Sequence, residues 1–131
     1  MLVSAAIPPG GSVPVIPRVF SLTHVQNTGV AFGLLAGASP VITALAALTL
    51  VLLLFYNKGR QIRTRAAGLG IAAMAGGAAG NLIDRVRLGH VVDYLDVHIW
   101  PVFNLADVAI VLGAAILIVA LSREGSPAPR R

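Results

Sequence analysis

Two aspartates, Asp93 and Asp107, are the residues of this chain best suited to chemistry. The sequence has five acidic residues, and four of them fall between positions 84 and 107. Long uncharged apolar runs lie on both sides of this window, and a carboxylate beside a bilayer is costly enough to indicate a function. Two neighbouring carboxylates can share one proton, so that one accepts a proton from water while the other donates. We therefore expect Asp93 and Asp107 to form a catalytic pair.

Each aspartate also has a structural interpretation. Asn104 and Asp107 stand three positions apart at the start of an apolar run, where they could cap a helix as its N-cap and third residue. Capping and catalysis are compatible, because a cap would hold the carboxylate in place. Asp93 lies in the apolar stretch HVVDYL and, judged from its neighbours alone, could equally be a solvated loop acid. The spacing leaves both alternatives open.

The composition indicates that membrane helices position this pair. Hydrophobic residues make up 56% of the chain and charged residues 11%, whereas soluble domains contain about 25% charged residues. Apolar runs of nearly bilayer-spanning length predict spans at about residues 40–57, 66–83 and 105–122. The second run is rich in glycine, which permits close helix packing. We predict one domain, residues 1–121, in an all-α integral membrane protein with three apparent transmembrane helices. The part before Pro40 is expected to form loops and short strands and no helix.

Basic residues give the expected orientation. The net charge is +5, but the cations flank apolar runs and form no aromatic-interleaved patch, so they indicate topology and not nucleic-acid binding. The loop at 58–65 carries four cations and no acid and is expected in the cytoplasm, together with a disordered tail at 123–131. Residues 1–39 and 85–105 then lie outside. Residues 1–39 would have to cross the membrane without a preceding span and without a secretory signal. We therefore expect that a first transmembrane helix is missing from this chain.

Other kinds of site have weaker support. His90, Asp93 and His98 do not follow a typical zinc spacing, and we predict neither a metal nor a cofactor. Serine catalysis is disfavoured, because three serines lack a nearby base in a recognisable motif: Ser21, Ser39 and Ser122. The stretch AGGAAGN lacks the lysine of a phosphate-binding loop, and the lack of cysteine excludes thiol catalysis.

The remaining acids of the window are given structural roles. Asp84 is adjacent to Arg85, and the two could form an interfacial ion pair or support the site. Asp84 is not expected to be a catalyst, and Asp96 is interpreted as a loop acid.

Four short polar clusters carry a resemblance to a known family. The clusters are Asn27-Thr28-Gly29-Val30-Ala31-Phe32, Gly80-Asn81-Leu82-Ile83-Asp84-Arg85, His90-Val91-Val92-Asp93 and Phe103-Asn104-Leu105-Ala106-Asp107. In these residues the chain resembles the lipoprotein signal peptidases, or signal peptidase II, whose signatures have the forms N-T-G-x-A-F, G-N-x-x-D-R, V-V-D and F-N-x-A-D. Each cluster is weak alone, but all four stand in the family order between apolar runs. The resemblance extends from about residue 13 to residue 121.

The resemblance implies an activity. Members are aspartic endopeptidases of the bacterial cytoplasmic membrane that remove signal peptides from prolipoproteins, cleaving before a cysteine that carries diacylglycerol. The family fold has four transmembrane helices and a small extracytoplasmic β-rich cradle, with the site near the outer face. The family's first helix has no counterpart here. The implied partners are lipid-modified prolipoproteins and membrane lipids, with no nucleic acid, and we expect a monomer.

The resemblance also assigns roles to residues. Asp93 and Asp107 would be catalytic. Five further positions would bind substrate or orient the pair: Asn27, Gly29, Asn81, Arg85 and Asn104. Asn27 has an alternative, because Asn-Thr-Gly is also a good turn sequence. Gly29 and Ala31 are expected to matter because they are small enough for a bulky lipidated substrate to pass close to the backbone.

Two other functions are alternatives to the peptidase. The chain could be an inactive fragment whose missing first helix prevents assembly. It could instead be a small transporter subunit in which the acids relay protons or ions. A relay requires a polar path through the spans, and the predicted spans are almost free of polar residues except on one face. The sequence therefore favours the peptidase.

Overall fold

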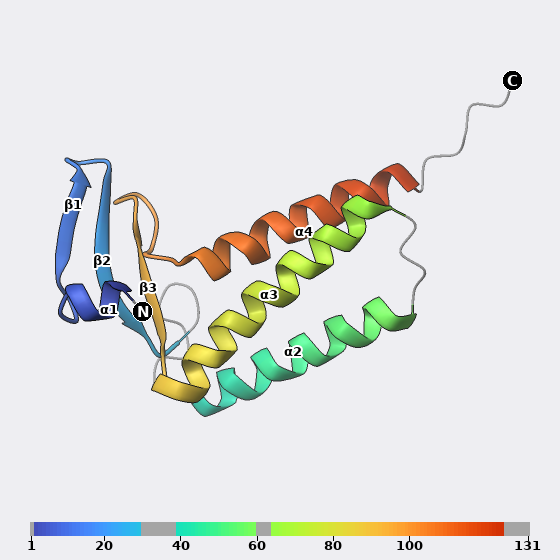
Figure 1. The fold of residues 1–131 in the computed structure, drawn as a ribbon, viewed down its shortest axis with the longest axis horizontal. Helices are drawn as coiled ribbons and strands as arrows, with labels where there is room; N and C mark the ends of the chain where they lie inside the picture. The colour runs from blue at the N-terminus through green and yellow to red at the C-terminus, as the bar shows by residue number, and fades with distance from the viewer. Residues whose placement is uncertain (1, 30–38, 60–63, 125–131) are drawn as a thin grey trace, which may run out of the picture.

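A computed structural model of the chain describes residues 2–29, 39–59 and 64–124. Helices and strands follow one another as α1 (Leu2–Ala6), β1 (Ser12–Ile16), β2 (Phe20–Asn27), α2 (Ser39–Gly59), α3 (Arg65–Leu88), β3 (Val91–Asp96) and α4 (Leu105–Glu124) (Figure 1). The strands form a sheet at one end of the three long helices. Several predictions lie outside the described residues: those for Ala31, for most of the basic loop and for the tail beyond residue 124.

The sheet brings a strand from the middle of the chain beside two strands from its beginning. Its order is β1-β2-β3 with antiparallel pairing throughout, and β-branched residues, which favour pleated structure, are frequent in it. Val25 pairs with Asp93 and Asn27 pairs with Val91, so the end of β2 lies beside the aspartate of β3. The small β element is thus confirmed. The all-α description is not confirmed, because this sheet carries Asp93.

Helix α3 leads directly into that strand. Its first turn is capped by Thr64, whose hydroxyl accepts a hydrogen bond from the backbone N–H of Ala67. At its other end Gly89 adopts φ 77°, and its N–H donates to the carbonyl oxygen of Arg85. A left-handed residue at this position is most easily glycine, since a Cβ would be strained there. The cap turns the chain from α3 into β3 and so fixes where Asp93 lies.

Glycines allow α3 and α4 to pack with their backbones close together. A Cβ added at Gly70 would lie 2.7 Å from the carbonyl oxygen of Gly113. A Cβ added at Gly77 would collide with the carbonyl oxygen of Ala106 and lie 2.8 Å from Cγ1 of Ile110. Ala106 directly precedes Asp107, so the contact at Gly77 places the first turn of α4 against α3. The role expected for small residues in this helix is therefore seen in the packing.

We expect Gly77→Ala to lower the free energy of unfolding by about 1–3 kcal/mol, because the added methyl group forces α4 away from α3. Gly76→Ala is the matched control, since a Cβ there meets nothing within 4 Å. It should leave the stability unchanged or raise it by up to about 1 kcal/mol, because alanine is a better helix former than glycine. Thermal unfolding of both variants in detergent, followed by circular dichroism, measures the difference. Equal melting temperatures would show that the two helices can separate at no cost.

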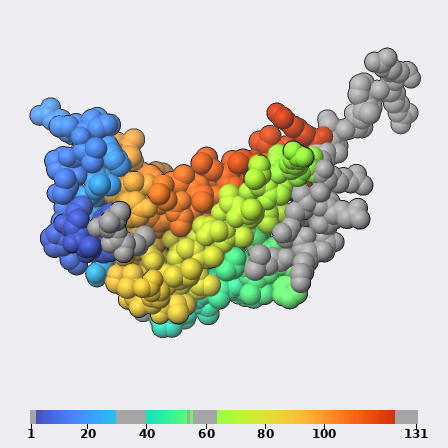
Figure 2. Space-filling view, in the orientation of Figure 1, coloured from blue at the N-terminus to red at the C-terminus, as the bar shows by residue number. Residues whose placement is uncertain are grey.

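The long helices present apolar side chains outward. Two of them, Arg65–Leu88 and Leu105–Arg123, are long and apolar enough to cross a membrane, and α2 contains a shorter apolar segment, Pro40–Leu53. Exposed side chains such as Leu52, Phe55 and Val111 would be unfavourable in water and suit a lipid environment. In the space-filling view the sheet stands at one end of the helical part (Figure 2). The helices occupy the predicted spans, and the number of membrane crossings stays a prediction.

Two sequence-based predictions about local structure are wrong. The segment before residue 40 is predicted to contain no helix, yet Leu2–Ala6 forms α1. The helix ends at Ala6, because Pro8 and Pro9 disfavour its continuation. The Nδ1 atom of His24 lies 2.7 Å from the carbonyl oxygen of Ile7 and ties this helix to β2. Asp96 was interpreted as a loop acid, but it is the last residue of β3 and pairs with Ser21.

Candidate active site

The amide of Asn104 joins the surroundings of the two aspartates. Its Nδ2 atom donates to Oδ1 of Asp93 over 2.7 Å and to Oδ1 of Asn81 over 3.1 Å. Asn81 in turn donates to Oδ1 of Asp107 over 2.7 Å. Asp93 and Asn104 are both buried, at 2% and 3% exposure. A chain of amide hydrogen bonds therefore runs from one candidate catalytic carboxylate to the other.

The second oxygen of Asp93 is also held by an amide. Asn27 Nδ2 donates to Asp93 Oδ2 over 2.8 Å, and Asn27 Oδ1 accepts the backbone N–H of Gly29 over 3.0 Å. The latter contact is the side-chain turn expected of Asn-Thr-Gly. Asn27 thus forms the turn and contacts the site at once, so that the turn holds the amide that binds Asp93.

Asp107 sits at the start of α4 in a reciprocal cap. Its backbone N–H donates to Oδ1 of Asn104 over 3.0 Å, and its Oδ2 accepts the backbone N–H of Asn104 over 3.2 Å. The predicted N-cap and third-residue arrangement is therefore present. Carboxylates at a helix N-terminus are stabilised by the helix dipole. The cap directs the Asp107 carboxylate toward Asn81 and fixes its orientation.

Arg85 and Asp84 have separate partners. Arg85 donates from Nη2 to the carbonyl oxygen of Gly29 over 3.1 Å, which connects α3 to the turn after Asn27. Its Nε atom is buried and has no hydrogen-bond partner among the residues that the structure describes. Asp84 accepts the backbone N–H of Val92 over 3.4 Å. Within the described ranges no ion pair joins Asp84 to Arg85, so the alternative of an interfacial pair is not supported, and both residues instead brace the elements around Asp93.

The surroundings of Asp93 favour its protonated form. Burial raises the pKa of its carboxyl group, because the charged form loses its hydration. Hydrogen bonds from Asn27 and Asn104 act in the opposite direction, the negative charge of Asp107 raises the pKa further, and Arg85 lowers it. The net direction is upward. Asp93 therefore keeps a proton to higher pH than an ordinary aspartate.

An apolar groove opens beside Asp107. It has a volume of about 420 Å³, and its lining residues come from the segment before α4 and from α4 itself: Val97, Trp100, Phe103, Asp107, Val108, Val111 and Leu112. Asp107 lies among lining residues that are otherwise apolar. A chain segment with apolar groups could rest here with a polar bond near the carboxylate. A larger cavity, about 500 Å³, lies near Thr64 and Arg123, at the other end of α3 and α4, and does not include the aspartates.

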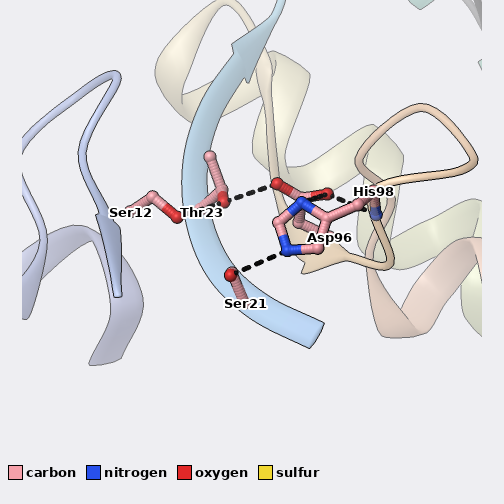
Figure 3. A network of polar contacts seen from close by, with 5 residues as sticks. All are labelled: Ser12, Ser21, Thr23, Asp96 and His98. Atoms are coloured by element: carbon pink, nitrogen blue, oxygen red, sulfur yellow. Dashed lines mark hydrogen bonds and ion pairs between the residues drawn. The ribbon is translucent and has the colours of Figure 1, made fainter. Parts of the chain in front are cut away.

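The structure brings one of the serines close to a base. The hydroxyl of Ser21, which stands in no recognisable motif with a base, lies 3.1 Å from Nε2 of His98, which approaches Asp96 (Figure 3). No sequence motif signals this contact, because 77 positions separate Ser21 from His98. Within the part of the chain that the structure describes, His90, Asp93 and His98 do not gather, nor do any three potential metal ligands.

Comparison with known protein sequences indicates one family. The family model for signal peptidase (SPase) II matches residues 1–123. A lipoprotein signal peptidase of Halothermothrix orenii is 48% identical over 116 residues, which cover 86% of this chain and 77% of that protein. A lipoprotein signal peptidase of Moorella thermoacetica is 50% identical over 109 residues, which cover 83% and 73%.

Solved structures with the same fold are bacterial membrane enzymes. One superposes with a TM-score of 0.86 at 28% identity, over 99% of this chain and 84% of the other. A second has a TM-score of 0.81 at 30% identity, over 92% and 80%. The arrangement of sheet and helices described above is therefore that of a membrane enzyme.

Proposed function

The chain belongs to the signal peptidase II family, and from this premise we propose that it removes signal peptides from prolipoproteins by aspartic catalysis. Asp93 and Asp107 would carry the reaction, and cleavage would fall just before the diacylglyceryl-modified cysteine. One observation supports this most strongly: amides bind both carboxylates, and the amide of Asn104 reaches Asp93 directly and Asp107 through Asn81. Asn27, Gly29 and Arg85 would orient the pair or the substrate.

The two aspartates would take different roles in the reaction. Asp107 would accept a proton from a water molecule whose oxygen attacks the scissile carbonyl carbon. Asp93, with its raised pKa, would donate its proton to the carbonyl oxygen. Collapse of the tetrahedral intermediate would then break the C–N bond. The proton taken from water would pass from Asp107 to the departing amine of the modified cysteine, and Asp93 would recover its proton from the intermediate.

The surface around the site suits a lipid-modified substrate in a membrane. The apolar groove beside Asp107 and the exposed apolar faces of the helices would accommodate apolar parts of the precursor. We propose that the spans at about residues 40–57, 66–83 and 105–122 cross the bacterial cytoplasmic membrane. The site would then lie near the extracytoplasmic face, and the protein would act as a monomer.

The proposal is tested by incubating the 131-residue chain in lipid with a synthetic diacylglyceryl-modified precursor peptide. Mass spectrometry should find a product whose first residue is the modified cysteine. The same peptide without the diacylglycerol is the substrate control. Cleavage at another bond, or equal cleavage of both peptides, would contradict the proposed specificity.

The pH dependence of cleavage should report the protonation of Asp93. Activity requires a protonated Asp93, so kcat/KM should fall by about tenfold per pH unit once pH rises above the pKa of this residue. Burial raises that pKa, so the alkaline limb should lie above the range of an ordinary aspartate. Folding stability should also decline as pH rises through this range, because the unfolded chain releases the same proton at lower pH.

The variant Arg85→Gln tests the assignment of this limb to Asp93. The positive charge of Arg85 lowers the Asp93 pKa, so its removal should move the alkaline limb to higher pH. Arg85→Lys keeps the charge and should keep the limb closer to that of the wild type. A limb that shifts to lower pH in Arg85→Gln would show that another group controls it.

A further inference from the structure

The connector, residues 97–103, joins the strand of Asp93 to the helix of Asp107. Its far end is fixed to β3: the N–H groups of Tyr94 and Leu95 both donate to the carbonyl oxygen of Phe103, at 2.9 and 2.7 Å. Phe103 returns a hydrogen bond to the carbonyl oxygen of Leu95. The connector is therefore a closed loop with both ends on β3, and its middle, with Trp100, forms one wall of the groove beside Asp107.

The connector begins with a strained turn at His98. This residue has φ 62°, and the N–H of Ile99 donates to the carbonyl oxygen of Val97 over 2.8 Å. A three-residue turn with positive φ at its centre is rare and unfavourable for a residue with a Cβ. Such conformations persist only where the surroundings hold them. His98 must therefore have contacts that keep it in this turn.

Those contacts come from two neighbouring strands. The Nε2 atom of His98 lies 3.1 Å from the hydroxyl of Ser21 on β2, and its Nδ1 lies 3.4 Å from Oδ1 of Asp96. The backbone N–H of His98 donates to the same oxygen of Asp96 over 2.9 Å. Thr23 donates to the other oxygen of Asp96 over 2.9 Å (Figure 3). We name the group of Ser21, Asp96 and His98 the catch.

In the catch a serine contacts a histidine and the histidine contacts an aspartate, as in a serine hydrolase. The burial of the serine argues against nucleophilic catalysis. Ser21 is 4% exposed and lies within β2, where a substrate carbonyl carbon could not reach its hydroxyl. The ring of His98 instead ends on a fixed hydroxyl. The contacts of the catch all serve to hold the first part of the connector against the sheet.

We propose that the catch positions the connector, and through it Trp100, at the groove beside Asp107. His98 is then a positioning residue for substrate binding, and this role rests on the proposed function. Since Phe103 is fixed independently by Leu95, loss of the catch should release the groove wall and leave Asn104 and the aspartates in place. The effect should therefore fall on KM more than on kcat.

The only tryptophan of the chain is Trp100, so its fluorescence reports the connector directly. Ser21→Ala removes the hydroxyl that contacts the His98 ring. His98→Asn removes the ring itself, and asparagine is chosen because it tolerates the positive φ of this position. Both variants should lower the fluorescence anisotropy of Trp100 in the absence of substrate. Ser12→Ala is the matched control, because Ser12 contacts only the far side of this network, at Thr23. It should leave the anisotropy unchanged.

Cleavage assays on the same variants use a precursor peptide without tryptophan. Ser21→Ala and His98→Asn should raise KM roughly fivefold, the factor that corresponds to one lost hydrogen bond, with kcat little changed. Unchanged anisotropy in both variants would overturn the positioning role, and so would loss of the folded state in both. Because anisotropy needs no substrate, it still tests the catch if the wild type fails to cleave, an outcome that would count against the proposed function alone.

Discussion

Asp107→Asn should lower the rate of prolipoprotein cleavage by at least about 1,000-fold, because the amide cannot accept the proton of the attacking water. Asparagine has nearly the same shape, and its amide oxygen can still accept the backbone N–H of Asn104, but its NH2 group cannot accept the hydrogen bond from Asn81. The cost to stability should therefore be about 1–3 kcal/mol, for one lost hydrogen bond to a charged group and the lost interaction with the helix dipole. A loss of rate of this size in a chain that stays folded would separate catalysis from capping.

The matched control is Glu124→Gln, which makes the same change from carboxylate to amide in the last turn of α4, at the end opposite Asp107. This variant should cleave at the rate of the wild type. Asp93→Asn should be as inactive as Asp107→Asn, because it removes the proposed proton donor to the scissile carbonyl. Cleavage by the double variant Asp93→Asn/Asp107→Asn would exclude the aspartic mechanism.

Sequence patterns of short range predicted much of this site. Asn104 and Asp107 stand at the spacing of a helix cap, and the cap is present with both hydrogen bonds. Asn27 stands in a turn sequence, and the turn forms. The apolar runs predicted the positions of α2, α3 and α4, because a long uncharged segment in a membrane has few alternatives to a helix. Interactions between residues that are close in the sequence could therefore be predicted.

Contacts between segments that are far apart in the sequence could not be predicted from such local patterns. The pairing of β2 with β3 sets Asn27 beside Asp93, 66 positions away, and Ser21 beside His98, 77 positions away. Neither pairing has a local signal, because the register of the two strands shifts between Leu22 and Val25. For the same reason Asp96 was taken for a loop acid. The five-residue α1 was missed because so short a helix depends on tertiary contacts.

The resemblance placed Asn104 near the aspartates, and the structure adds a specific arrangement. Its backbone and Oδ1 atom cap α4, while its Nδ2 atom donates to Asp93 and Asn81. The oxygen of this side chain therefore caps the helix, while its NH2 group binds the surroundings of the catalytic pair. The two roles can be separated, since serine and asparagine are comparable N-caps but serine has no amide N–H.

Asn104→Ala should lose both roles. Removal of the cap should lower the free energy of unfolding by about 1 kcal/mol. Among the residues with a described structure, removal of the N–H donor leaves buried Asp93 with the side-chain hydrogen bond from Asn27 alone. A hydrogen bond to a charged group contributes about 1.5–3 kcal/mol. If the transition state depends on this contact, kcat should fall by about 10- to 150-fold. Thermal unfolding and single-turnover cleavage measure the two effects.

Asn104→Ser should then recover the stability of the cap while its kcat stays as low as that of Asn104→Ala. Thr64→Ala provides the opposite control, because it removes the cap of α3 far from the aspartates and should cost stability with no loss of kcat. If Asn104→Ser cleaves like the wild type, the amide has no part in catalysis and Asn104 acts only as a cap. If it stays slow, the hydrogen bond from Asn104 to Asp93 is needed in the transition state, which explains why a buried amide stands between two acids.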